Sequence, residues 1–143
     1  MASFAINGGQ RYYDVTEIEV KAEEPEISED QSWDMFIEAV IWKESRGNKM
    51  AVGDSGKAVG VLQIHPIMVR EANRILKMKN GSGVSYTYDD RYSREKSIEM
   101  FKIVQDYYNS GHDFDLALQV WNKNHPESYR TQIMNKYTEL MSI

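Results

Sequence analysis

Residues 32–66 read SWDMFIEAVIWKESRGNKMAVGDSGKAVGVLQIHP and hold the clearest pattern in the chain. The first part of this stretch has apolar side chains at the spacing of one face of an α-helix: Trp33, Phe36, Ile37, Val40 and Ile41. Gly47 is a residue type that commonly ends helices. We therefore expect a helix with one buried face, then a polar, glycine-containing loop at residues 47–60 and a short apolar segment at residues 61–64.

Glu44 is an acidic residue on the apolar face of this helix. It lies eleven positions after Trp33, which at about 100° per residue places both side chains within about 20° of the same face. Burial and the negative end of the helix dipole would both raise its pKa, and a carboxylic acid that stays protonated near neutral pH can act as a general acid. The alternative is a glutamate in a frayed last turn that faces solvent, or one that pairs with Lys43 or Arg46, and position alone favours that alternative.

Four further helices are expected after this loop. Pro66 suits the first turn of the second helix, which the NGSG segment at residues 80–83 ends. Ser93 can cap a third helix that reaches about residue 109. The apolar residues of these two helices that are expected to face inward are Met68, Ala72, Ile75, Leu76, Met100, Ile103, Val104 and Tyr107.

The last two helices are predicted at residues 114–121 and from Pro126 onward. Residues 114–121, FDLALQVW, are apolar on nearly every side and indicate a short central helix buried all round, or a buried strand. The final helix is expected to bury Ile133, Tyr137, Leu140 and Met141. Residues 31–143 are therefore predicted to form a mainly α, single compact domain.

The acidic residues are concentrated near the N-terminus. The 143-residue chain has a formal net charge of −5, but residues 17–30 hold seven acidic residues and one basic residue. That tract carries −6 and leaves +1 for the rest of the chain. Residues 1–30 are predicted to be an acidic, partly flexible arm with a short strand at residues 11–20. Such an arm either lies loosely on the domain or attaches it to a protein partner.

Composition and sequence patterns argue against several classes of function. The chain has no cysteine, and its histidines, at 65, 112 and 125, show no metal-ligand spacing, so neither a metal nor a cofactor is expected. The acidic balance and the lack of a basic recognition helix argue against nucleic-acid binding. No apolar run approaches the roughly 18 residues of a membrane span, and no signal peptide is visible.

Three sequence elements follow one another in a characteristic order: the pair Glu44-Ser45 at a helix end, a loop with small residues at 47–59, and GVLQIHP at residues 60–66. Together they resemble the soluble lytic transglycosylase family of the lysozyme-like superfamily. The segment ALQVWN at residues 117–122 is similar to that family's aromatic-Asn element, although Lys123-Asn124 replaces the usual glycines. The resemblance extends from about residue 32 to the C-terminus, and it implies a lysozyme-like fold with a substrate cleft.

The resemblance also implies a substrate and a reaction. The substrate is a peptidoglycan glycan strand, cleaved at the β-1,4 bond between N-acetylmuramic acid and N-acetylglucosamine. Glu44 would protonate the leaving oxygen and then take the proton of the muramic C6 hydroxyl, which closes a 1,6-anhydro ring. The candidate substrate-binding residues are Ser45, Asp54, Gln63, Tyr88, Tyr92 and Asn122.

Asp54 leaves the type of product open. The segment GDSGKAVGVLQI at residues 53–64 resembles goose-type lysozymes, in which aspartates help to position a water for hydrolysis. Asp54 matches the first such position, whereas His65 occupies the second, where an ordinary residue before a proline is the favoured interpretation. Hydrolysis by a lysozyme-type enzyme and a non-catalytic peptidoglycan-binding module on the same fold therefore remain alternatives.

The site of action follows from the implied substrate. Peptidoglycan lies outside the cytoplasmic membrane, so the protein is expected to act on the periplasmic or extracellular cell wall. Without a visible export signal, release by another route is expected, as for a phage-type lysin.

Overall fold

The structure is a computed structural model that describes residues 26–81, 83 and 85–143. In this part of the chain the α-helices are α2 (Glu29–Ser45), α3 (Pro66–Asn80), α4 (Arg94–Tyr108), α5 (Phe114–Trp121) and α6 (Glu127–Met141). A two-stranded antiparallel hairpin, β1 (Val52–Gly53) and β2 (Ala58–Val59), is the one sheet here. The mainly α fold is confirmed. The predicted arm and strand at residues 11–20 lie outside the described residues.

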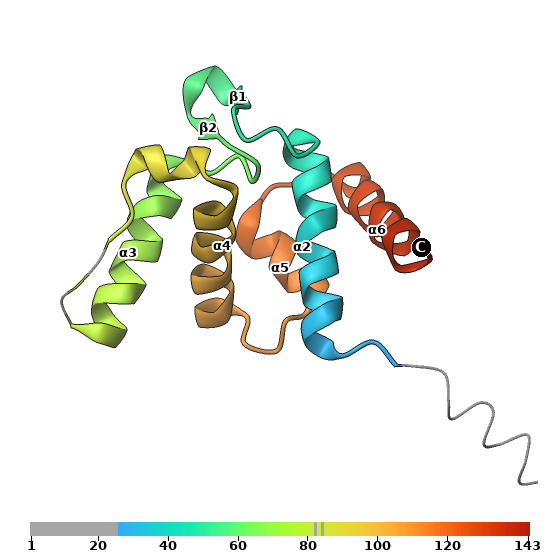
Figure 1. Cartoon of the computed structure of the whole chain (residues 1–143). Helices are drawn as coiled ribbons and strands as arrows, with labels where there is room; N and C mark the ends of the chain where they lie inside the picture. Colours follow the sequence, from blue (N-terminus) through green and yellow to red (C-terminus); the bar gives the residue numbers. More distant parts are fainter. Residues whose placement is uncertain (1–25, 82, 84) are drawn as a thin grey trace, which may run out of the picture. The chain divides into compact units, whose positions relative to one another are not determined.

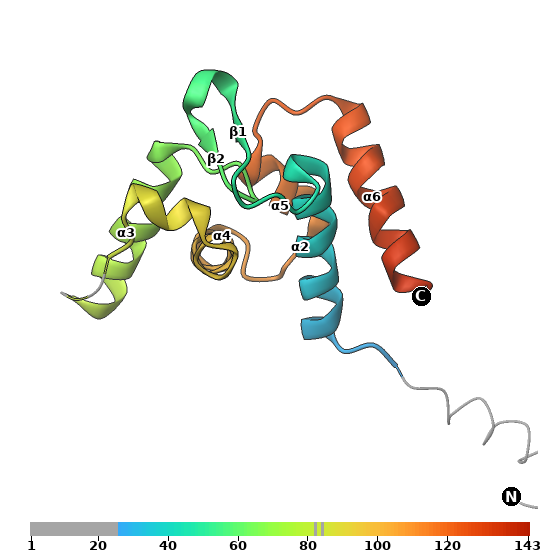
Figure 2. The same cartoon turned by 45° about the horizontal axis from the view of Figure 1, so that its top comes forward.

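Residues Ser32–Ile143 form one compact unit with an apolar core between its helices. Figures 1 and 2 show how these helices are arranged. Helices α3 and α4 lie side by side, and α6 lies beside α2. The predicted stripe of α2 is buried as expected, from Trp33 to Ile41. Buried residues from α3, α4, α5 and α6 complete this core, among them Ile75, Phe101, Leu118 and Ile133.

Two predictions of burial are wrong. Helix α5 forms as predicted, but only Ala117 and Leu118 are buried in it, and Leu116 is 42% exposed. The helix therefore packs on the core through one side. Tyr107 is also 42% exposed. It lies in the last turn of α4, beyond the edge of the core, where its ring contacts that of Tyr108 at 4.8 Å between centroids.

The loop between α2 and α3 is held by close backbone packing. Gly60 has a φ of 86°, and a Cβ atom there would lie 1.8 Å from the carbonyl oxygen of Arg91. Arg91 belongs to the 3-10 helix η2 (Tyr88–Tyr92), and its guanidinium donates to the carbonyl oxygens of Lys57 and Ile64 at 3.0 and 2.9 Å. These contacts fix the hairpin and the following turn against η2.

Within the described residues, no helix combines the length and apolar character needed to cross a membrane.

Candidate active site

Glu44 lies in the last turn of α2 and is half-buried. The hydroxyl of Tyr129, from the first turn of α6, donates a hydrogen bond to its Oε2 atom. Burial raises the pKa of Glu44, while the Tyr129 hydrogen bond and the charge of Lys43 act in the opposite direction. Burial is the largest of these effects, so the net direction favours a protonated carboxyl.

A cleft of about 470 Å³ opens beside Glu44. Of the predicted site residues, the structure brings Glu44, Asp54, Gln63 and Asn122 together on its walls. The remaining wall residues are Ala58, Ile64, His65, Ile67, Met68, Trp121, Lys123 and Asn124. The walls come from the end of α2, the hairpin, the start of α3 and the end of α5, so the four predicted residues meet although they are far apart in sequence.

Gln63 lines the cleft but has little freedom to bind a ligand with its amide nitrogen. Its Nε2 atom donates to the carbonyl oxygens of Ala51 and Gly60 at 3.1 and 3.0 Å. A Cβ atom at Gly53 would lie 2.6 Å from Oε1 of Gln63, so the glycine lets the hairpin approach this side chain. The amide nitrogen therefore fixes the loop between β1 and α3.

Ser45 is not among the residues that line the cleft. Its hydroxyl donates to the carbonyl oxygen of Val61 at 2.7 Å and accepts from the backbone N–H of Gly47 at 3.1 Å. Ser45 thus ties the end of α2 to the turn after the hairpin, and its contacts are with the protein backbone.

Tyr88 and Tyr92 are not on the cleft walls either. Both lie in η2, the 3-10 helix that packs against the hairpin loop. The Tyr88 hydroxyl accepts a hydrogen bond from Arg70 at 3.1 Å. To contact either tyrosine, a glycan strand bound in the cleft would have to extend beyond the cleft walls.

Tyr129 and Trp121 are site residues that the sequence analysis did not single out. Tyr129 lies four and eight positions before the predicted core residues Ile133 and Tyr137, so extending their spacing backwards would have found it. The indole N–H of Trp121 donates to the carbonyl oxygen of Leu62 at 3.3 Å, and its ring packs edge-on against Phe101. Trp121 thereby offers a fixed aromatic wall to the cleft.

A comparison with protein families identifies a known domain in this chain. The family model of the transglycosylase SLT domain matches residues 23–129. The chain belongs to the transglycosylase SLT domain family. Curated proteins and solved structures gave no significant match. Family membership gives this SLT domain a lysozyme-like fold and a general activity, the transglycosylase-type degradation of cell-wall peptidoglycan.

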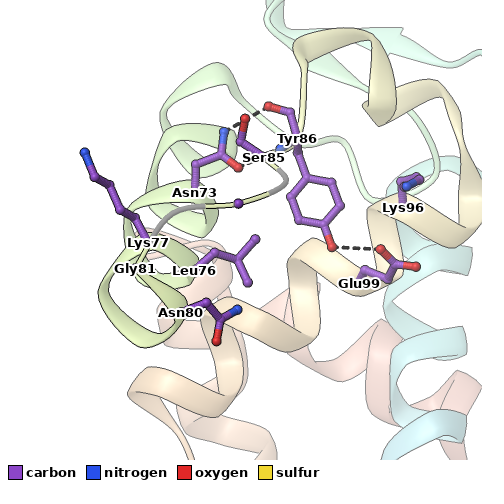
Figure 3. A pocket seen from close by; sticks show the side chains of 10 residues that line it. Asn73, Leu76, Lys77, Asn80, Gly81, Ser85, Tyr86, Lys96 and Glu99 are labelled. Carbon is purple, nitrogen blue, oxygen red and sulfur yellow. Dashed lines mark hydrogen bonds between the residues drawn. The ribbon is translucent and has the colours of Figure 1, made fainter.

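The SLT domain has a second cavity, of about 610 Å³, between the C-terminal half of α3 and α4 (Figure 3). Its charged wall residues are Lys77, Lys96 and Glu99. The Tyr86 hydroxyl donates to Glu99 at 2.7 Å, and burial, followed by Glu99, raises the pKa of this tyrosine. Glu99 is thus a half-buried carboxyl group that accepts a tyrosine hydroxyl, as Glu44 does in the first cleft.

Proposed function

We propose that this SLT domain cleaves the β-1,4 bond between N-acetylmuramic acid and N-acetylglucosamine, with Glu44 as the general acid. The observation that carries the proposal is a half-buried carboxyl group with a raised pKa on the wall of an open cleft. A protonated carboxyl in such a place can give its proton to the oxygen of a glycosidic bond.

The proposed reaction runs in two steps on one carboxyl group. As the bond between C1 of the muramic residue and the leaving oxygen breaks, Glu44 transfers its proton to that oxygen. The resulting carboxylate then takes the proton of the muramic C6 hydroxyl, and O6 forms a bond to C1. The product ends in a 1,6-anhydro ring, and Glu44 is protonated again. A water in place of the C6 hydroxyl would give hydrolysis, as in lysozymes.

Other groups on the cleft walls would hold the sugar chain. Trp121, the last residue of α5, and Asn122, which follows it, both line the cleft and offer it an aromatic ring and an amide. Amides suit N-acetyl groups and sugar hydroxyls, and aromatic rings pack on the apolar faces of sugars. Lys123 and Asn124 add polar groups where the lytic transglycosylase motif usually has glycines.

The proposal places catalysis in residues 31–143 and leaves residues 1–30 outside the reaction. The acidic tract at residues 17–30 would be a site of attachment for a protein partner, because it carries a charge of −6.

Digestion of purified peptidoglycan by the Glu44→Gln variant tests the general-acid assignment. Loss of a general acid should slow the release of soluble fragments by at least about a hundredfold. Glu38→Gln is the matched control, because Glu38 lies on the same helix and pairs with Arg94 away from the cleft. Retained activity in Glu44→Gln would overturn the assignment, and products from neither wild type nor variant would favour a binding module.

A further inference from the structure

The turn after α5 brings a lysine to the wall of the Glu44 cleft. Lys123 lines this cleft, and in the part of the chain that the structure describes no ion pair includes it. We propose that Lys123 binds a carboxylate on the side group of the muramic residue, so that the cleft selects peptidoglycan over neutral polymers of N-acetylglucosamine. This inference rests on the proposed function and names the group by which the cleft recognises its substrate.

Hydrogen bonds hold this turn in one conformation. The carbonyl oxygen of Asn122 accepts the backbone N–H of His125 at 3.0 Å and the Nδ1–H of the same histidine at 2.7 Å. Nε2 of Gln119, on α5, donates to the carbonyl oxygen of Lys123 at 3.2 Å. The backbone on both sides of the Lys123 side chain is therefore fixed, and the side chain starts from a defined point of the cleft wall.

The shape of the turn accepts side chains at both of its central positions. Neither Lys123 nor Asn124 has a positive φ, so the backbone here does not require glycine. These two residues stand where the lytic transglycosylase motif usually has glycines. The replacement leaves the backbone unstrained and adds one cation to the cleft wall.

The turn also packs beside the partner of the proposed general acid. The ring of His125 lies 5.4 Å from the ring of Tyr129, centroid to centroid, and the Tyr129 hydroxyl donates to Glu44. The segment that carries Lys123 is thus linked through Tyr129 to the carboxyl group. A muramic residue whose bond is cut beside Glu44 would lie in the same cleft as the lysine.

The charges on the wall favour an acidic ligand. Glu44 accepts the Tyr129 hydroxyl, and Asp54 lies 3.0 Å from His65. Among the described wall residues, Lys123 is the one lysine or arginine, and it is exposed. Each muramic residue carries a lactyl group, which ends in a free carboxylate or in a stem peptide with carboxylates of its own. N-acetylglucosamine has no carboxylate, so an ammonium group can distinguish the two sugars.

Titration calorimetry with soluble, uncross-linked glycan strands tests the proposal. The Glu44→Gln protein is used, with and without a change at Lys123, so that the strands stay whole. Lys123→Met should raise the Kd about threefold to fivefold, whereas Lys123→Arg should keep it. Conversion of the carboxyl groups of the strands to amides should weaken binding of the Lys123 protein by a similar factor and leave that of Lys123→Met unchanged. A merely structural role would change the Kd for charged and amidated strands alike, which would overturn the proposal.

Two kinds of strand identify the carboxylate that is bound. Strands from which an amidase has removed the stem peptides keep only the lactyl carboxylate. An effect of Lys123→Met that persists on these strands assigns the lysine to the lactyl carboxylate, and an effect that is lost assigns it to a carboxylate of the stem peptide. Either result supports the proposal.

Lys79→Met is the matched control, because it removes the same charge from the last turn of α3, away from the cleft wall. It should keep the Kd of the parent protein. An unchanged Kd in Lys123→Met, or an equal increase in Lys79→Met, would overturn the inference. Failure of the wild type to cleave the strands would instead overturn the proposed function, while the calorimetry would still decide whether Lys123 binds a carboxylate.

Discussion

The hydroxyl of Tyr129 donates a hydrogen bond to Oε2 of Glu44, although 85 residues separate them. This bond works against the effect of burial. Burial raises the pKa of Glu44, whereas the phenol stabilises its carboxylate and lowers that pKa. Burial, followed by the charge of Glu44 and the same hydrogen bond, raises the pKa of Tyr129, so the phenol stays protonated and remains a donor. The protonation of Glu44 is therefore set jointly by α2 and α6.

Removal of this donor should change the pH dependence of activity. In Tyr129→Phe, the carboxylate of Glu44 loses a hydrogen bond, so its pKa rises further. Because Glu44 acts in its protonated form, the alkaline decline in activity should move to higher pH. The measurement is the rate of peptidoglycan solubilisation across a pH series. Tyr137→Phe is the control, since the Tyr137 hydroxyl, also on α6, bonds to Ser32 at 2.7 Å instead. Identical profiles for Tyr129→Phe and wild type would contradict this coupling.

The raised pKa of Glu44 should also appear in the stability of the protein. The folded chain binds the Glu44 proton more tightly than the unfolded chain, whose reference pKa is 4.5. The stabilisation is complete below about that pH and is lost as pH rises through the folded pKa. Glu44→Gln removes this loss, because glutamine does not ionise. Urea unfolding of both proteins should show the variant gaining stability relative to wild type as pH rises. A difference that stays constant with pH would mean that Glu44 has no raised pKa.

The helices could be predicted because their patterns are local. The α2 stripe, Pro66 in the first turn of α3 and the Ser93 cap of α4 each lie within a few residues of what they determine. Burial at helix ends was harder to predict, because it depends on how far the neighbouring elements extend. Tyr107 has the spacing of the buried face of α4, yet it lies beyond the edge of the core and is exposed.

The site could be predicted only in part, for a related reason. Glu44 was found from its place on an apolar face together with a family resemblance. Its partner Tyr129 lies on another helix, and only folding brings the two together. Gln63 and Ser45 were predicted to bind substrate, but the structure uses most of their hydrogen-bonding groups on backbone atoms. Sequence spacing does not reveal such local contacts.

The contacts of Ser45 predict a loss of stability when its hydroxyl is removed. In Ser45→Ala, the buried Val61 carbonyl loses its side-chain donor and the N–H of Gly47 loses its acceptor. We expect a loss of about 1–3 kcal/mol in the free energy of unfolding, with an unchanged KM for peptidoglycan fragments. Ser142→Ala is the control, because that hydroxyl bonds an exposed carbonyl at the end of α6. A raised KM with unchanged stability would instead assign Ser45 to substrate binding.

The close approach of Gly60 to η2 predicts that this glycine tolerates no side chain. In Gly60→Ala, the new methyl group would lie 1.8 Å from the carbonyl oxygen of Arg91, which also accepts a hydrogen bond from the Ser97 hydroxyl at 3.0 Å. The loop and η2 would have to separate, and we expect a loss of more than about 3 kcal/mol in the free energy of unfolding. Gly56→Ala separates this overlap from backbone strain, because Gly56 has a similar φ of 92° but open space around it. Its cost should be only about 1–2 kcal/mol. Equal losses in urea unfolding would mean that φ alone, and not contact with Arg91, requires glycine at position 60.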